Sequence, residues 1–433
     1  MTGPGAADAA YAIGNGVVAD GAGVFLEDGA LLIRGDRIVE AGSTRAVRRR
    51  CSRFEDVHGR LVLPGFLNAH HHLYSALAPG IRPRGDTGTF TRILENLWWP
   101  LDAAMDREAL YVSALLGIAD SVRHGATMIF DHHASMAFVK GSLETVARAF
   151  GEAGVAGTLG FETSDRRGSR EARRHIEENL AFGESSRPPR LEAVMGLHAN
   201  LTLGEETLAA VAAAKPADMP VHIHCGEAPA DLERCRELGY QGPVDRLHRH
   251  GLLDGRSILA HAIHLSEEDY RLIHRVKPVV VSNPESNANN RVGVMNAGRI
   301  RRYVLGTDGM SGDMVATLRA HLLLSDRRES IHAAEVFFRG RLAVQEAFFP
   351  DTGTFRSGAV ADIAVLDYAP VSPMDRDNLT DHLVFGARSG RAYLTVAGGR
   401  IVCREGAVTF MDEEAVRREA RKAAAALWRR YEA

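Results

Sequence analysis

Cysteine, lysine and long apolar runs are scarce in this sequence, and each shortage excludes a class of protein. The few cysteines stand far apart without a CxxC pair, which argues against a disulfide framework or a cysteine zinc site and favours free thiols. They are Cys51, Cys225, Cys235 and Cys403. Nowhere do about eighteen apolar residues follow one another, and the beginning of the chain lacks the basic start and apolar stretch of a leader. We therefore expect a soluble cytoplasmic protein without a membrane span.

An excess of charge of one sign is also lacking. Acidic and basic residues nearly cancel, for a formal net charge of −3, so no overall field favours nucleic acid or an anionic membrane as a partner. A small molecule is the expected partner. The chain has 433 residues, 45% of them hydrophobic, which is enough for a barrel of about 250 residues and a smaller attached unit.

Short β-rich segments with turn signals lie at both ends of the chain, whereas its middle alternates apolar runs with helical stretches. Residues 29–39 predict a hairpin around Gly35 and Asp36, and 398–402 resemble another. From residue 61 onward, the alternation is typical of βαβ units and a parallel sheet. One such helical stretch is 107–124, which has apolar residues at helical spacing and Gly125 as a stop.

The predicted strands of the middle section are residues 61–67, 127–130, 155–161, 193–197, 221–224, 258–261, 278–281 and 303–305. These strands and the helices between them predict an α/β fold, a (β/α)₈ TIM-type barrel over 61–349. The segments 1–60 and 350–411 are expected to pair into a small composite β-sandwich. The segment 412–433, rich in Ala, Arg and Glu, is expected to form a surface helix.

Histidines occur where these strands end. His70 and His72 follow the first strand, so that both can face one ion while His71 points away. Taken alone, this pair also fits a polar loop. His224 ends the fifth strand and Glu227 comes shortly after it. Taken alone, His224 also fits a buried histidine that is bonded to the backbone.

Two further strand ends carry His261 and Asp308. His261 ends the sixth strand, and Asp308 follows the eighth in a Gly-Thr-Asp-Gly turn, a context in which aspartate is usually a turn residue or a cap. In such a barrel the carboxyl ends of all strands form one rim, where catalytic residues lie. The rim would then hold the side chains of His70, His72, His224, Glu227, His261 and Asp308.

These motifs resemble those of the amidohydrolase superfamily over nearly the whole chain, in particular its aminohydrolase branch with chlorotriazine hydrolases and guanine and cytosine deaminases. The resemblance implies catalytic roles for Glu227, His261 and Asp308, and metal ligands at His70, His72, His224 and Asp308. The segments 70–75, 130–135 and 282–287 are similar to the aminohydrolase SsnA. Two features depart from the branch. Ser282 stands where many deaminases have histidine, and the short segment 287–302 indicates a shortened seventh helix.

The ligand set also indicates the cofactor. A divalent ion held by three imidazoles and a carboxylate is a Lewis acid that brings the pKa of bound water toward 7. Binuclear members of the superfamily bridge their metals with a modified lysine, but none of the few lysines ends a predicted strand, so we expect one ion per chain. Nitrogen and oxygen ligands suit Zn²⁺ first and Fe²⁺ as the alternative. The lysines are Lys140, Lys215, Lys277 and Lys422.

Other side chains near the rim are candidates for substrate binding. His198 follows the fourth strand at a position that binds substrate in similar deaminases. Glu162 follows the third strand, where it equally fits a salt bridge to a nearby arginine. Trp98 and Trp99 lie in the loop after the first strand, where they also fit loop packing or an oligomer contact. The last candidates are His132 or His133 after the second strand.

The leading functional prediction is a metal-dependent aminohydrolase. Water would attack a C–N bond of an aminated N-heterocycle, purine-, pterin- or triazine-like, and ammonia would leave. Glu227 would move the water proton to the substrate while His261 and Asp308 orient the water. One alternative is a hydrolase that opens a cyclic amide or ureide ring in purine breakdown. A second alternative is a non-catalytic metal-containing barrel, against which the presence of both Glu227 and His261 argues. Relatives are commonly dimers or larger, so a homo-oligomer is expected.

Overall fold

Parallel strands form a barrel in the middle of the chain. The computed structural model describes residues 10–325, 330–387 and 389–433. One sheet has the order β6-β7-β8-β9 and another the order β10-β11-β12-β13-β14, and both are parallel throughout. Their strands are β6 (Phe66–His71), β7 (Ala126–His133), β8 (Ala156–Phe161), β9 (Leu191–Ala193), β10 (Met195–Ala199), β11 (Val221–Cys225), β12 (Ile258–His261), β13 (Val279–Ser282) and β14 (Val304–Leu305).

Backbone bridges join the two sheets at both seams. Thr163, just after β8, pairs with Leu197 of β10, and His71 of β6 pairs with Asp308, just after β14. The Asp308 amide donates to the His70 carbonyl at 2.9 Å. The fourth barrel position is shared by β9 and β10, which are interrupted at Val194. The strands therefore close into the predicted (β/α)₈ barrel.

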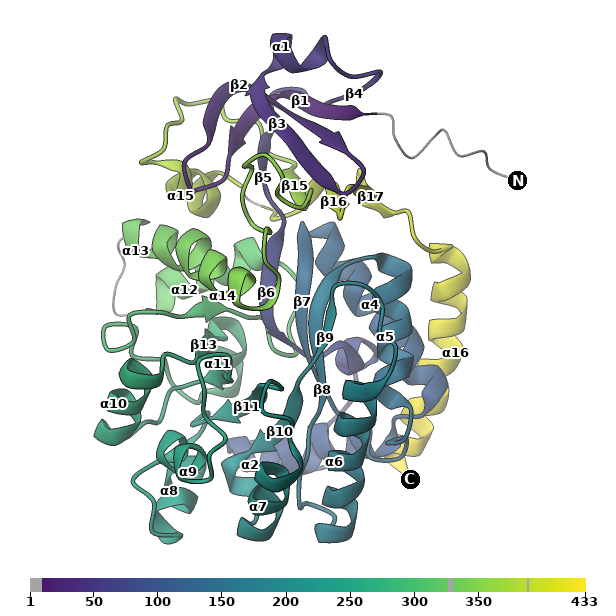
Figure 1. Ribbon diagram of the computed structural model, residues 1–433. Helices are drawn as coiled ribbons and strands as arrows, with labels where there is room; N and C mark the ends of the chain where they lie inside the picture. The colour runs from purple at the N-terminus through teal and green to yellow at the C-terminus, as the bar shows by residue number, and fades with distance from the viewer. Residues whose placement is uncertain (1–9, 326–329, 388) are drawn as a thin grey trace.

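Helices follow the barrel strands and cover the outside of the barrel (Figure 1). The helix predicted at 107–124 is present as α4, and Gly125 at its end has a positive φ of 81°. The expected shortening of the seventh helix is found in α11, which has 7 residues. The helices are α4 (Arg107–Arg123), α5 (Ser142–Ala153), α6 (Ser169–Glu184), α7 (Glu205–Ala214), α8 (Pro229–Glu237), α9 (Pro243–Arg249), α10 (Glu267–Val276), α11 (Pro284–Asn290), α12 (Met314–Leu324), α13 (Ser330–Ala334) and α14 (Arg341–Phe348).

The first predicted strand, 61–67, is two strands that belong to different sheets. β5 (Leu61–Pro64) pairs with β1 and β15, whereas β6 starts at Phe66 and pairs with β7. Gly65 stands between them, and a Cβ there would lie 2.1 Å from Oγ1 of Thr127. Glycine therefore lets the chain pass close to β7 as it leaves one sheet for the other. The sequence predicts a single strand here because both segments are apolar, and both are buried in the structure.

The two ends of the chain form one sheet above the barrel (Figure 1). Its order is β18-β17-β16-β15-β5-β1-β2-β3, and β4 pairs with β1. The hairpin predicted around Gly35 joins β2 to β3. The segment 398–402, which resembles a hairpin in the sequence, joins β16 to β17. Its strands are β1 (Tyr11–Ala19), β2 (Phe25–Arg34), β3 (Arg37–Ser43), β4 (Arg53–Asp56), β15 (Ile363–Leu366), β16 (Ala392–Ala397), β17 (Arg400–Arg404) and β18 (Ala407–Val408), together with β5.

The core of this unit joins both ends of the chain. It is made by apolar side chains such as Ile13, Val62, Ile363 and Val396, all fully buried. We propose that this unit comprises 1–60 and 350–411 and that the barrel comprises 61–349. The exception is β5, whose four residues, 61–64, belong to the sheet of this unit.

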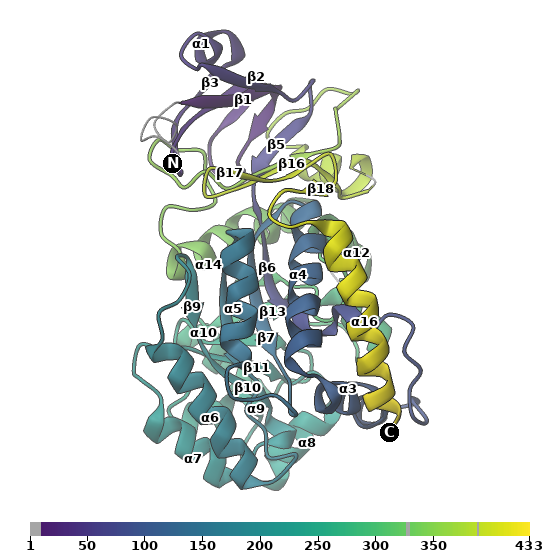
Figure 2. The same cartoon turned by 90° about the vertical axis from the view of Figure 1, so that its right-hand side faces the viewer.

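The helix predicted at 412–433 is α16 (Glu413–Glu432), which runs along the side of the barrel beside α4 (Figure 2). Asp412 caps its first turn by accepting from the Ala415 amide. Most of its side chains face outward, but Ala420, Leu427 and Tyr431 are buried. No helix in the described part of the chain is long and apolar enough to cross a membrane.

Candidate metal centre and active site

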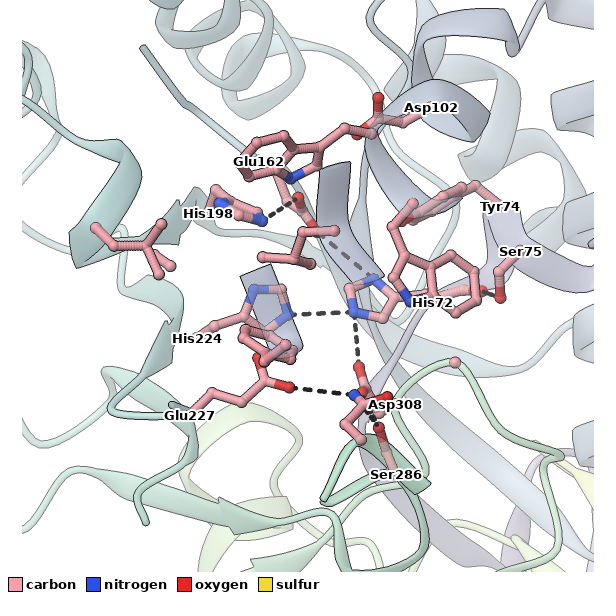
Figure 3. Close-up of a pocket in the computed structure, with 18 of the residues that line it drawn as sticks. His72, Tyr74, Ser75, Asp102, Glu162, His198, His224, Glu227, Ser286 and Asp308 are labelled. Atoms are coloured by element: carbon pink, nitrogen blue, oxygen red, sulfur yellow. Dashed lines mark hydrogen bonds and ion pairs between the residues drawn. The ribbon is translucent and has the colours of Figure 1, made fainter. Parts of the chain in front are cut away.

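Four side chains meet at the carboxyl end of the barrel, and all four are buried. His70 is in β6 and His72 directly follows it, His224 is in β11, and Asp308 follows β14. Because these strands are parallel, their ends lie at one rim, and the side chains converge there although they are up to 238 residues apart. Figure 3 shows His72, His224 and Asp308 joined around one point.

Distances between their donor atoms suit a single metal ion. Nε2 of His72 lies 2.8 Å from Oδ1 of Asp308 and 3.2 Å from Nε2 of His224. Nε2 of His70 lies 3.2 Å from the same Asp308 oxygen. Ligands at about 2.0–2.1 Å from a tetrahedral ion are separated by about 3.4 Å. The four donor atoms therefore fit one ion with a small outward adjustment.

The second nitrogen of His70 and that of His72 are each held by a neighbour. Nδ1 of His72 contacts the carbonyl oxygen of His132 at 2.6 Å, and Nδ1 of His70 contacts Nε2 of His222 at 2.9 Å. Such partners orient an imidazole and keep Nε2 free for a metal. His222, which has no ligand role in the sequence pattern, thereby acts as a support for His70.

Electrostatics at this point favour one positive charge. Burial lowers the pKa of His70 to about 3 and that of His224 well below its usual value, so both imidazoles are neutral, as metal ligands must be. At His72 the Asp308 carboxylate outweighs burial and raises the pKa to about 9. Against its own burial, Asp308 is held well below its usual pKa by hydrogen bonds with His70 and His72. A carboxylate among imidazoles thus attracts a cation.

Two overlapping sets of donor atoms lie within 4.8 Å of one another, and they share His70 and His224. One set adds His72 and His132, and the other adds His261 and Asp308. Nε2 of His132 contacts the carbonyl of His222, and its Nδ1 lies 3.4 Å from Glu162. Both nitrogens of His132 therefore face protein groups, and its role is to hold His72 through its carbonyl oxygen.

Two candidates for proton transfer adjoin the centre. Oε2 of Glu227 lies 3.6 Å from Nε2 of His261. Burial, reinforced by the Asp308 carboxylate, raises the pKa of Glu227 well above its usual value. Burial lowers the pKa of His261, and its Nδ1 contacts Oδ1 of Asn287 at 2.7 Å. Because an amide oxygen only accepts, Nδ1 carries the hydrogen and the Nε2 lone pair faces Glu227 and the centre.

The backbone is unusual at two of these residues. His261 and Asp308 have φ values of 74° and 56°, in the left-handed region that non-glycine residues rarely adopt. Such conformations concentrate at functional sites. Here they turn each side chain inward at the point where its strand ends.

A pocket opens above the centre. His72, His224, Glu227 and Asp308 lie on its wall, so a bound molecule can reach the ligands. The predicted substrate-binding residues Trp98, Trp99, Glu162 and His198 also line it.

His132 is placed differently from what the sequence suggested. It is fully buried, stacks on His222 with 4.4 Å between ring centroids, and is not among the residues that line the pocket. The alternative, His133, is also fully buried and contacts Ser135. Neither His132 nor His133 is among the residues that line the pocket, and a contact of either with substrate stays a prediction.

A family model described as the amidohydrolase family matches residues 61–402. The chain belongs to the amidohydrolase family. It is 26% identical over 406 residues to the 5-methylthioadenosine/S-adenosylhomocysteine deaminase of Thermococcus sibiricus, which covers 90% of this chain and 93% of that protein.

Solved structures share the fold of this amidohydrolase. Adenosine deaminase from Xanthomonas campestris, solved with bound zinc, has a TM-score of 0.82 at 23% identity and covers 96% of this chain and 98% of its own. E. coli guanine deaminase has a TM-score of 0.77 at 21% identity and covers 91% of this chain and 99% of its own. The predicted family is confirmed, and with it a hydrolase that acts on C–N bonds. The closer likeness to SsnA stays a prediction.

Sequence reasoning missed what α11 does in this amidohydrolase. Ser286 donates a short hydrogen bond to Oδ2 of Asp308, and Asn287 holds His261. Asn290 lies 3.5 Å from Oε1 of Glu227. One short helix therefore contacts all three predicted catalytic residues. The only signal was the run Ser282-Asn-Pro-Glu-Ser-Asn, which carried the likeness to SsnA but does not show where its side chains point.

The far wall of the pocket was also missed in part. Arg166 pairs with Asp102 at 2.9 Å, lies 3.9 Å from Glu162, and its guanidinium stands 5.2 Å from the Trp99 ring. Burial raises the pKa of Glu162 to about 7. The suggested salt bridge of Glu162 to an arginine thus exists at long range, and Glu162 still lines the pocket.

Proposed function

We propose that this amidohydrolase is an aminohydrolase with one divalent metal ion. It replaces the exocyclic amino group of an aminated N-heterocycle by oxygen and releases ammonia. The observation that carries the proposal is the position of Glu227, a buried carboxyl group beside the ligand cluster, on the wall of the pocket and within 3.6 Å of His261.

His70, His72, His224 and Asp308 would hold the ion. When bound there, a divalent ion acts as a Lewis acid and lowers the pKa of water toward 7. Zinc is our first choice because the ligands are nitrogen and oxygen and because the Xanthomonas adenosine deaminase was solved with zinc, and Fe²⁺ is the alternative. One ion is favoured because Lys215 and Lys277 end helices and neither follows a barrel strand.

The residues of the chain divide the proton transfers among themselves. Glu227 takes a proton from the attacking water and passes it to a ring nitrogen or to the leaving amine. The water oxygen bonds to the ring carbon, the C–N bond breaks, and the amine leaves as ammonia. His261, with its Nε2 lone pair toward the centre, accepts a hydrogen bond from the water, and Asp308 fixes the direction of attack.

Hydrogen-bonding groups around the pocket favour a planar, polar substrate. Thr202 gives its hydroxyl hydrogen to the Ala199 carbonyl and so accepts from Nδ1 of His198. This leaves Nε2 of His198 as an acceptor for a ring N–H or an amino group. Nη2 of Arg166 and Nε1 of Trp99 are buried donors without a hydrogen-bond partner among the described residues. Both residues line the pocket beside His198.

An aminated purine with a substituent is the substrate class that we favour. The names of the relatives, a methylthioadenosine/S-adenosylhomocysteine deaminase and an adenosine deaminase, support an aminated purine. The free cysteines favour a reducing compartment, so we place the enzyme in the cytosol, and we expect a homo-oligomer.

A panel assay tests the proposal. The metal-loaded protein is incubated with aminated purines, purine nucleosides, pterins and triazines, and with cyclic amides and ureides, and ammonia and new carboxylate are both measured. Ammonia from at least one aminated ring, with its keto product, supports the aminohydrolase. New carboxylate without ammonia from the aminated rings would contradict it and favour ring opening.

A further inference from the structure

One wall of the pocket is formed by a segment that lies outside the barrel sheets. Residues 78–104 cross from β6 toward α4 and supply Phe90, Leu94, Trp98, Trp99 and Asp102 to the pocket. The regular part of this segment is one continuous helix over 90–104, made of α2 (Phe90–Ile93), the π-helix η2 (Leu94–Trp98) and α3 (Trp99–Ala104). An isolated helix of this length is only marginally stable in water. The wall therefore depends on contacts made from outside it.

Arg166 makes one such contact through Asp102, and side chains near the end of α16 make three more. Nε1 of Trp428 donates to the carbonyl of Leu77 at 3.0 Å, at the start of the wall. Nε of Arg430 donates to the carbonyl of Ala104 at 2.8 Å, at its end. The Tyr431 hydroxyl reaches the middle, where it donates to the carbonyl of Asn96 at 2.8 Å. The two ends and the centre of the wall are thus held by one helix (Figure 2).

The contact at Tyr431 is the most deeply buried of the three. Tyr431 is 1% exposed, its hydroxyl also lies 3.1 Å from the carbonyl of Arg82, and the Arg84 guanidinium stands 5.0 Å from its ring. The amide of Arg84 donates to the same Asn96 carbonyl at 2.8 Å. Two parts of the segment 78–104, around Arg82 and around Asn96, therefore meet at the Tyr431 hydroxyl.

Asn96 links this contact to the pocket. It lies in η2, two residues before Trp98, and Trp98 is on the pocket wall. The wide turn of a π-helix is commonly found at functional sites. A shift of the Asn96 carbonyl would therefore move the Trp98 ring, whereas no residue of α16 lines the pocket itself.

We propose that Trp428, Arg430 and Tyr431 are positioning residues for the substrate pocket. Substrate affinity would then depend on a helix that touches neither the substrate nor the metal ligands. The proposal rests on the proposed function only in taking this pocket as the substrate site. The rest of α16 is anchored separately, since Glu413 pairs with Arg123 of α4 and accepts from the Val408 amide. Loss of one hydroxyl at Tyr431 should therefore leave the helix in place.

Tyr431→Phe tests the proposal, because it removes the hydroxyl and keeps the buried ring. The matched control is Tyr111→Phe, which makes the same chemical change on α4, where the hydroxyl binds Glu152 away from the pocket. Hydrogen exchange of peptides within 78–104 is measured on both metal-loaded variants, together with kcat, KM and metal content.

We expect Tyr431→Phe to speed exchange in 78–104 several-fold and to raise KM about 3- to 10-fold, the effect of one lost hydrogen bond. We expect kcat to stay within about twofold and the metal content to stay unchanged, and the control to match the wild type. Unchanged exchange in 78–104, or a fall in kcat at constant KM, would overturn the proposal. Hydrogen exchange needs no substrate, so this test stands even if no panel compound is deaminated.

Discussion

Glu227→Gln should stop turnover and leave the metal centre intact. The amide has the shape of the carboxyl group but cannot take a proton from water. In the described structure the Glu227 carboxylate has its ion-pair contact with Nε2 of His261 at 3.6 Å. None of the four proposed ligands hydrogen-bonds to Glu227. Loss of a general base typically lowers the rate about 10²- to 10⁴-fold, which corresponds to roughly 2.7–5.4 kcal/mol of activation free energy.

The assay is ammonia release under saturating substrate, with metal analysis and thermal melting of the same preparation. We predict a kcat lower by at least about 100-fold, about one ion per chain, and an unchanged melting temperature. A matched control is Glu285→Gln, because Glu285 lies on the same short helix as Ser286 and binds Thr317 instead of the site. Full activity of Glu227→Gln would refute the proton-transfer role. A variant without metal would show that Glu227 is a ligand.

Three further changes probe the ligand cluster, its support and the fold. Removal of the ion with a chelator should abolish activity and lower the melting temperature, since a ligand bound only to the folded state stabilises it, and Zn²⁺ or Fe²⁺ should restore both; activity that survives complete removal would contradict a metal role. Asn287→Ala should lower kcat about 10- to 100-fold with metal retained, because His261 loses the acceptor that orients it, and Asn287→Asp should recover most of the rate; equal loss in both variants would argue against orientation. Ile363→Ala, in the core of the terminal sheet, should cost about 2–5 kcal/mol in urea unfolding and leave kcat unchanged, whereas a lost kcat in the folded variant would show that the sheet controls the site.

Much of the barrel could be predicted from the sequence because its strands are apolar runs that end in polar residues. Each predicted strand overlaps an observed one, and the ends that carry His224 and His261 are found within one residue of where the pattern puts them. The split at Gly65 was not predictable, because both halves of the run are buried and only the pairing with β7 and β15 separates them.

The metal ligands could be predicted from the sequence for the same reason. A histidine at the end of a parallel strand has only one rim to face, so strand order alone brings His70, His224 and Asp308 together. The residues that hold the ligands in place could not be predicted. His222 lies three residues before the end of β11 and His132 one residue before the end of β7, close to the ligands, and only the distances show that Nε2 of each faces another protein group.

The wall of the pocket was the least predictable part. Trp98 stood out by its residue type, but nothing in the local sequence says that Tyr431 binds the carbonyl of Asn96, two residues earlier, since that contact spans 335 residues. Likewise, α16 has the composition of a surface helix, and its buried side, with Leu427 and Tyr431, is a minority of its residues. Contacts between segments so far apart follow from the packing of the whole fold.

Titration of the metal-free protein with Zn²⁺ tests the central claim most directly. Ammonia release from the best panel substrate is measured against equivalents of metal added. A single centre at His70, His72, His224 and Asp308 predicts no release without metal, a linear rise, and a plateau at about one equivalent per chain. Ammonia release by the metal-free protein, or a rise that continues to two equivalents, would contradict a hydrolase that works with one ion.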